Sequence, residues 1–66
     1  MTEEKDYIQL DQFLKLINVV ASGGEAKHLI REGAITVNGE VETRRGRKLR
    51  NGDQVEFDGH TFAVSI

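Results

Sequence analysis

The sequence predicts an α+β fold in which two short N-terminal helices pack on a small antiparallel β-sheet. In the first half of the chain, apolar residues recur with the three- and four-residue spacing of helices. After Gly33 they alternate with polar residues, as in half-buried strands. Two pairs typical of hairpin turns, Asn38-Gly39 and Asp58-Gly59, interrupt the alternating stretches.

A first helix is expected over residues 10–19. Four apolar residues share the i, i+3, i+4, i+7 spacing of one helical face: Leu10, Phe13, Leu14 and Ile17. Asp11 suits the first turn, because a carboxylate there meets the positive end of the helix dipole. Tyr7 and Ile8, just before this helix, indicate a short edge strand.

A second helix is expected between Ser22 and Gly33. Ser22 and Glu25 have the capping-box spacing, in which the Ser22 hydroxyl accepts from the Glu25 amide and the Glu25 carboxylate from the Ser22 amide. Gly33 can adopt the left-handed conformation that ends a helix. The buried stripe comprises three apolar residues: Ala26, Leu29 and Ile30. Lys27 and Arg31 stand four apart on another, exposed face.

The first hairpin has two possible registers. A two-residue loop at Asn38-Gly39 would set Val41 opposite Thr36 and mix polar with apolar residues on each face. A three-residue loop that begins at Val37 and has Gly39 in a bulge sets Val41 opposite Ile35 instead. Because this register keeps the apolar residues together, it is the one that we predict.

The second hairpin is expected to have a two-residue loop at Asp58-Gly59. This loop pairs Val55 with Phe62 and places one apolar row on the inner face. His60 starts the last strand on the core-facing side of this register, which predicts a half-buried histidine. Asn51-Gly52 is expected to form the turn before this hairpin.

Charge is segregated along the chain, although the formal net charge is only −2. Residues 1–14 and residues 51–66 each carry −3, whereas residues 15–50 carry +4, from eight Lys/Arg and four Glu. Five of the seven residues at 44–50, here called the basic segment, are cationic: Arg44, Arg45, Arg47, Lys48 and Arg50. Such a loop, anchored only by Leu49, can neutralise phosphates. The alternative is a solvated loop that is kept charged for solubility.

The type of nucleic acid follows from what surrounds these cations. The basic segment contains no aromatic residue, which argues against a stacking platform for single strands and favours folded RNA recognised by shape and phosphate. Gly23 and Gly24, in the first turn of the second helix, could leave backbone amides open to a phosphate. Alternatively, they only ease a tight turn between the helices. Asn38, at the first hairpin tip, is expected to add a polar contact.

Several classes of protein are not expected. The hydroxyl-bearing residues and the two histidines form no recognisable nucleophile–base set, so we predict no catalytic residues and no cofactor. His28 lies between Glu25 and Glu32, where a helical ion pair is expected rather than a metal ligand. The chain has no cysteine and no apolar run long enough to span a membrane or to act as a signal peptide. We therefore expect a cytoplasmic protein without a metal site.

The order of these features resembles the RNA-binding domain named after ribosomal small-subunit protein four, the S-four domain or alpha-L motif. The resemblance covers residues 8–58. It rests on a series of short matches: Leu10-Asp11, Ser22, Ala26-Lys27, Leu29-Ile30, Gly33, Val37-Asn38-Gly39, Gly52-Asp53, Val55 and Phe57. The 22–27 and 44–49 runs are further similar to the small stand-alone bacterial branch, the YaaA/YbcJ-type proteins. Gln9 and Gly23 depart from the family, since many members have arginine there.

The resemblance implies RNA binding without an attached catalytic domain. We expect a monomer that forms one domain over residues 1–66, with residues 1–6 as a flexible acidic end. Its partner would be ribosomal RNA or another structured RNA, with ribosomal proteins as further contacts. The predicted RNA-binding residues are Lys27, Arg31, Arg44, Arg45, Arg47, Lys48, Arg50, Asn38, Gly23 and Gly24. The alternative function is an adaptor whose basic loop docks on an acidic protein in a ribosomal assembly.

Overall fold

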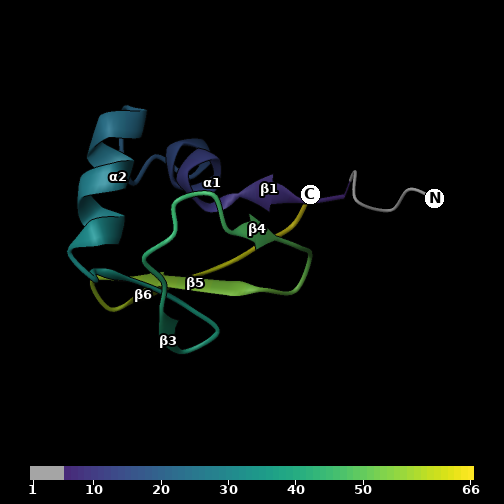
Figure 1. Ribbon diagram of the computed structural model, residues 1–66. Coiled ribbons are helices and arrows are strands. Elements are labelled where there is room, and N and C mark those ends of the chain that lie inside the picture. The colour runs from purple at the N-terminus through teal and green to yellow at the C-terminus, as the bar shows by residue number, and fades with distance from the viewer. Residues whose placement is uncertain (1–5) are drawn as a thin grey trace.

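The structure, a computed structural model, describes residues 6–66 and has the predicted α+β architecture (Figure 1). The elements follow in the order β1 (Ile8–Gln9), α1 (Leu10–Leu16), α2 (Gly23–Arg31), β2 (Ile35–Val37), β3 (Glu40–Val41), β4 (Lys48–Leu49), β5 (Gln54–Phe57) and β6 (His60–Ala63). The expected flexible end, residues 1–6, lies outside the described residues except for Asp6.

The strands form two antiparallel sheets. The larger sheet has the strand order β3-β2-β5-β6, and β1 pairs separately with β4. In Figure 1 the two helices lie on one side of the larger sheet, and the β1–β4 pair lies beside α1. The predicted edge strand at Tyr7-Ile8 is thus found one residue later, in β1.

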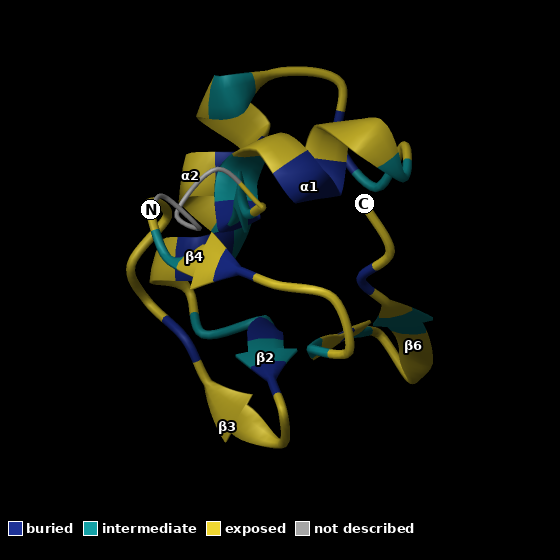
Figure 2. Cartoon of the chain, turned by 90° about the vertical axis from the view of Figure 1, so that its right-hand side faces the viewer, coloured by how far each residue is buried: buried dark blue, intermediate teal, exposed yellow. Residues whose placement is uncertain are grey.

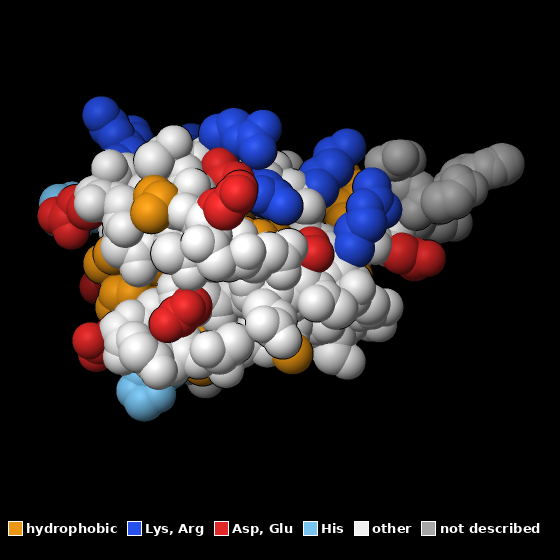
Figure 3. Space-filling model, turned by 90° about the horizontal axis from the view of Figure 1, so that it is seen from below, with side chains coloured by type: hydrophobic (Ala, Val, Ile, Leu, Met, Phe, Trp, Pro, Cys, Tyr) orange, Lys and Arg blue, Asp and Glu red, His pale blue; other side chains and the backbone are white. Residues whose placement is uncertain are grey.

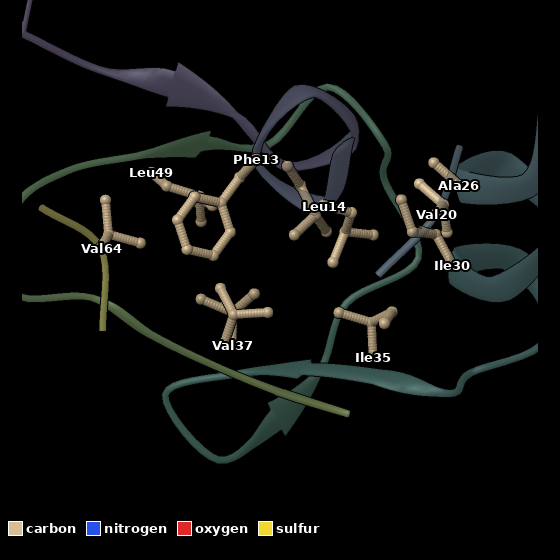
Figure 4. Close-up of a cluster of buried hydrophobic side chains, with 11 residues drawn as sticks. Phe13, Leu14, Val20, Ala26, Ile30, Ile35, Val37, Leu49 and Val64 are labelled. Atoms are coloured by element: carbon tan, nitrogen blue, oxygen red, sulfur yellow. The ribbon is translucent and has the colours of Figure 1, made fainter. Parts of the chain in front are cut away.

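The core lies between the helices and the larger sheet. Phe13 and Leu14 point from α1 toward Val37, and the apolar side chains of α2 close one end (Figure 4). β3 is exposed along its whole length (Figure 2). The buried apolar residues are Leu10, Phe13, Leu14, Val20, Ala26, Ile30, Ile35, Val37, Leu49, Val55 and Val64.

Helix α1 ends at Leu16, three residues before the predicted end. Asn18 has a φ of 64°. The Val19 amide donates to the Leu14 carbonyl at 3.0 Å and the Asn18 amide to the Lys15 carbonyl at 3.1 Å. These two bonds form a Schellman motif, in which a left-handed residue closes the helix. The apolar spacing continues past this stop, which explains why periodicity alone extended the helix.

Helix α2 begins and ends largely as predicted. The Ser22 hydroxyl accepts from the Glu25 amide at 3.3 Å, but the Glu25 carboxylate accepts from the Ala21 amide at 2.7 Å rather than from that of Ser22. At the other end Gly33 has a φ of 82°, and the Ala34 amide donates to the Leu29 carbonyl. α2 therefore also ends in a Schellman motif.

The predicted register of the first hairpin is wrong. Asn38 and Gly39 have φ values of 53° and 88° and form a two-residue turn, so that Val41 pairs with Thr36. Val41 is consequently 59% exposed. The Glu42 amide then donates to the Ile35 carbonyl at 3.0 Å. This register places polar and apolar side chains on the same face of the hairpin. Glu42, the polar residue that becomes buried, is paired there with two arginines.

The predicted register of the second hairpin is confirmed. Val55 pairs with Phe62, and the Asp58-Gly59 turn has φ values of 54° and 80°. The expected half-burial of His60 is wrong. This residue pairs with Phe57 and is exposed, because it adjoins the turn at the outer end of the hairpin.

Candidate nucleic-acid interface

The basic segment is docked on the N-terminus of α1 through its backbone. The Arg47 carbonyl accepts from the Leu10 amide at 2.9 Å, and the Arg45 carbonyl from the Asp11 amide at 3.0 Å. The first amides of a helix have no partner within the helix, and the N-cap residue Gln9 provides no side-chain hydrogen bond. Carbonyls of the basic segment therefore satisfy amides that would otherwise need another cap.

The C-terminal part of the basic segment is a strand, which corrects the prediction of a continuous loop. β4 pairs with β1, with Leu49 opposite Ile8 and Lys48 opposite Gln9. Leu49 is fully buried, as expected for the apolar anchor of the segment. Strand pairing and helix capping together hold this stretch of cations in one place, so the segment is more than a solvated loop.

Two of the predicted phosphate ligands share one carboxylate. Glu42 Oε2 lies 3.0 Å from Arg44 Nε, and Glu42 Oε1 lies 2.9 Å from Arg47 Nη1. Glu42 is only 6% exposed. The hydrogen bond from the Arg44 side chain, together with those from Arg47 and the Arg44 amide, outweighs burial and lowers the pKa of Glu42 to about 2. The carboxylate is thus ionised and partly neutralises two arginines.

The other predicted cations are exposed. Within residues 6–66, no ion-pair partner is found for Lys27, Arg31 or Arg45. Lys48 and Arg50 are exposed as well. Figure 3 shows that the Lys and Arg side chains line one edge of this face of the molecule. This edge is the one surface in the view where positive charge predominates.

The two parts of the predicted site border separate hollows. Arg44, Gly46, Arg47 and Lys48 line one hollow on the basic segment. Another, on the exposed side of α2, is lined by Gly24, Lys27, His28, Arg31 and Glu32. His28 Nε2 lies 2.7 Å from Glu32 Oε2, so the expected pairing of these two side chains along the helix is present as a close polar contact. No residue lines both hollows, so a ligand that meets all the cations must extend from α2 to the basic segment.

Gly23 and Gly24 are not required by packing. A Cβ at Gly23 would meet no atom within 4 Å, and one at Gly24 only the Ser22 hydroxyl at 3.8 Å. Neither residue has a positive φ, so a tight turn does not explain them. A phosphate contact at these amides therefore stays a prediction.

Asn38 makes two hydrogen bonds within the fold that the sequence did not predict. Its Nδ2 donates to Asp53 Oδ1 at 3.2 Å, and its Oδ1 accepts from the Gln54 amide at 2.9 Å. Both ends of the side-chain amide thus tie the first hairpin turn to the start of β5. We assign Asn38 to the fold rather than to the interface.

Tyr7 belongs to this surface and was missed by sequence reasoning. Lys48 Nζ lies 4.8 Å from the centroid of the Tyr7 ring. The contact arises because β1 and β4 pair across some forty positions of the chain. The edge strand expected at Tyr7-Ile8 was the available signal, but its partner could not be read from the sequence. An aromatic ring therefore does adjoin the basic segment.

Other kinds of site are not seen in the described part of the chain. Residues 6–66 contain no group of three or more His, Asp or Glu side chains that could hold a metal ion. None of the helices described is long and apolar enough to cross a bilayer. The candidate site in the described residues therefore consists of the docked basic segment and α2.

Comparison with known proteins identifies the domain. A model of the S4 domain matches residues 1–65. The chain belongs to the S4 domain family. The solution structure of Escherichia coli YbcJ, described as revealing an alfaL motif involved in RNA-binding, is similar with a TM-score of 0.68 and 36% identity. It covers all of this chain and 82% of YbcJ.

Two small bacterial relatives of this S4 domain match in sequence. "Probable ribosome maturation protein RlbA" of Bacillus subtilis (strain 168) is 50% identical over 56 residues, which are 85% of this chain and 79% of RlbA. YbcJ of E. coli (strain K12) is 41% identical over 58 residues, covering 88% of this chain and 83% of YbcJ. The predicted resemblance to the YbcJ-type branch is confirmed.

The S4 domain also matches a small part of larger enzymes. A crystal structure of a pseudouridylate synthase superposes with a TM-score of 0.76 over 85% of this chain but 24% of the enzyme. At 21% identity this likeness shows the fold alone. Gln9 and Gly23, the two positions at which arginine was expected from the resemblance, lie where the helices begin. Gln9 is the N-cap of α1, and Gly23 is the first residue of α2.

Proposed function

We propose that this protein is a non-enzymatic RNA-binding protein that holds structured RNA, and ribosomal RNA in particular, through phosphate contacts. The contacts come from Lys27 and Arg31 on α2 and from the basic segment. One observation carries the proposal: the backbone docking of the basic segment on α1. A segment fixed in this way presents its cations without the ordering cost of a free loop.

The names of the relatives support the same class of ligand. YbcJ is described as carrying a motif involved in RNA-binding, and the name of RlbA refers to ribosome maturation. Both relatives are small proteins matched over most of their length. A chain of this kind would therefore act by binding RNA.

The edge of cations suits folded RNA better than an isolated strand. Its two hollows lie on different elements, and folded RNA offers phosphates at fixed spacings that can reach both. Double-stranded RNA is recognised mostly through shape and backbone contacts. If about four phosphates are neutralised, log K should fall with log salt concentration with a slope of about −3 to −4.

The test separates phosphate ligands from residues that hold the fold. The variant K27A/R31A/R45A removes three exposed cations and leaves the Glu42 ion pairs intact. Filter binding to ribosomal RNA fragments should show weaker binding and a shallower salt slope for every RNA sequence. K15A removes one exposed lysine of α1 outside the predicted site and controls for the loss of a single charge. Equal affinities for the triple variant and the control would refute the site.

A second experiment addresses the partner in cells. At low salt the protein should sediment through a sucrose gradient with a ribosomal subunit or its precursor, and high salt or the triple substitution should release it. A salt-sensitive complex with an acidic protein that survives ribonuclease would instead indicate the adaptor function.

A further inference from the structure

The β1–β4 pair presents an outward face beside the basic segment. Side chains alternate between the two faces of a sheet, and Leu49, opposite Ile8, is fully buried. Lys48 and its partner Gln9 therefore point outward. Tyr7 precedes Gln9 by two positions and falls on the same face, as its contact with Lys48 shows.

This face combines an aromatic ring with positive charge. Lys48 Nζ, at 4.8 Å from the Tyr7 centroid, is within the range of a cation–π interaction. Tyr7 is only half-buried, so part of its side chain is in contact with solvent. Arg44, Gly46 and Arg47 line a hollow together with Lys48. The ring therefore stands at the border of the proposed phosphate site.

We propose that Tyr7 is a stacking site for one unpaired RNA base, with Lys48 neutralising the phosphate of that nucleotide. The inference rests on the proposed RNA-binding function and names its substrate class: structured RNA that carries an unpaired nucleotide beside a helix. Bases inside a duplex are covered by their neighbours, whereas bases in bulges, loops and ends can be splayed onto an aromatic side chain.

Lys48 does not prevent this stacking. A lysine ammonium is carried on a flexible four-carbon stem, and it interacts more strongly with a full negative charge than with the quadrupole of a ring. When a phosphate arrives, Lys48 can move from Tyr7 to the phosphate while the base takes the ring face. The two residues thus act on one nucleotide, the ring on the base and the ammonium on the backbone.

The test uses two RNA hairpins with the same stem, one fully paired and one with a single unpaired adenosine. Anisotropy of labelled RNA gives the affinities of the wild type, Y7F and Y7L. Y7F keeps the ring, whereas Y7L keeps apolar bulk without it. Y7L should bind the bulged RNA about tenfold more weakly and the paired RNA almost normally, while Y7F resembles the wild type.

The chain offers a direct probe, because Tyr7 is its only tyrosine. Protein labelled with fluorotyrosine should give one fluorine NMR resonance, which shifts on addition of the bulged RNA and much less with the paired RNA. Thermal unfolding of Y7L shows whether the variant is folded. If Y7L has failed to fold, the fluorine shift of the wild type alone decides.

Three outcomes would overturn the inference. Tyr7 does not stack on a base if Y7L binds the bulged RNA like the wild type, or if the fluorine resonance does not distinguish the two RNAs. In either case, salt-sensitive binding of the wild type would still support the proposed function. If the wild type binds neither hairpin nor ribosomal RNA, the proposed function fails and the stacking site with it.

Discussion

Glu42 Oε1 lies 2.9 Å from Nη1 of Arg47, and the same carboxylate also receives three hydrogen bonds from Arg44. Glu42 is the buried acidic residue in the described part of the chain, and it is placed directly before the cations that we assign to RNA. One residue thus stabilises the segment and restrains two of its positive charges.

Replacing Glu42 by glutamine should release those charges. Gln lacks the negative charge that holds Arg44 and Arg47, so both guanidinium groups become available to phosphates. For E42Q the slope of log K against log salt should become steeper than that of the wild type. The exposed acidic residue Glu40 provides the control E40Q, which removes the same charge without an arginine partner. Identical slopes for E42Q and E40Q would contradict a restraining role.

Glu42 should also make stability depend on pH in the acid range. Its pKa is lowered from 4.5 to about 2 in the folded protein, so the unfolded state binds the proton more readily. The stabilisation is complete above pH 4.5 and is lost as the pH falls toward 2. After allowance for solvent screening it is on the order of 2 kcal/mol.

Urea unfolding at several pH values measures this dependence. The difference in unfolding free energy between the wild type and E42Q should be largest at neutral pH and should shrink between pH 4.5 and pH 2. A difference that is independent of pH would show that the loss comes from packing rather than from the ionised carboxylate.

Asn38 should matter for stability but not for RNA binding. N38A removes the hydrogen bonds to Asp53 and Gln54 and places an alanine at a φ of 53°. We expect a loss of about 2 kcal/mol in unfolding free energy. N38G accepts the backbone conformation and loses only the side-chain bonds, so it should lose less. If both N38A and N38G are folded and both bind RNA more weakly than the wild type, Asn38 belongs to the interface.

Asn18 should be improvable by glycine. It holds a φ of 64° at the C-terminus of α1, a conformation that costs most L-residues about 1 kcal/mol and glycine very little. N18G should keep or raise the thermal unfolding midpoint, and N18A should lower it. If alanine is tolerated as well as glycine, the left-handed stop of α1 does not limit stability.

Much of the fold could be predicted because local signals agreed with it. The capping of α2 by Ser22, its stop at Gly33 and the second hairpin each depend on residues close in sequence. The register of the first hairpin was predicted wrongly because keeping the apolar residues on one face was given more weight than the turn itself. Asn38 and Gly39 both have positive φ and form a two-residue turn. The predicted α1 was too long because Asn18 was not recognised as a residue that can take the left-handed conformation and end a helix.

The residues of the candidate interface follow from their charges, whereas the contacts among them come from the structure. Charge density identified the basic segment, and periodicity identified Lys27 and Arg31 on one face. The sharing of Glu42 and the ring of Tyr7 depend on side-chain geometry and on strand pairing across the chain. Neither contact can be predicted from the composition or from the spacing of residues in the sequence.

The docking of the basic segment has a consequence for how such a surface can change. Arg45 meets the Asp11 amide through its carbonyl, a group that every amino acid carries. The side chain at this position can therefore be exchanged without losing the hydrogen bond that anchors the main chain. Over evolution, or in a designed library, other side chains can be tried at position 45 on an unchanged scaffold.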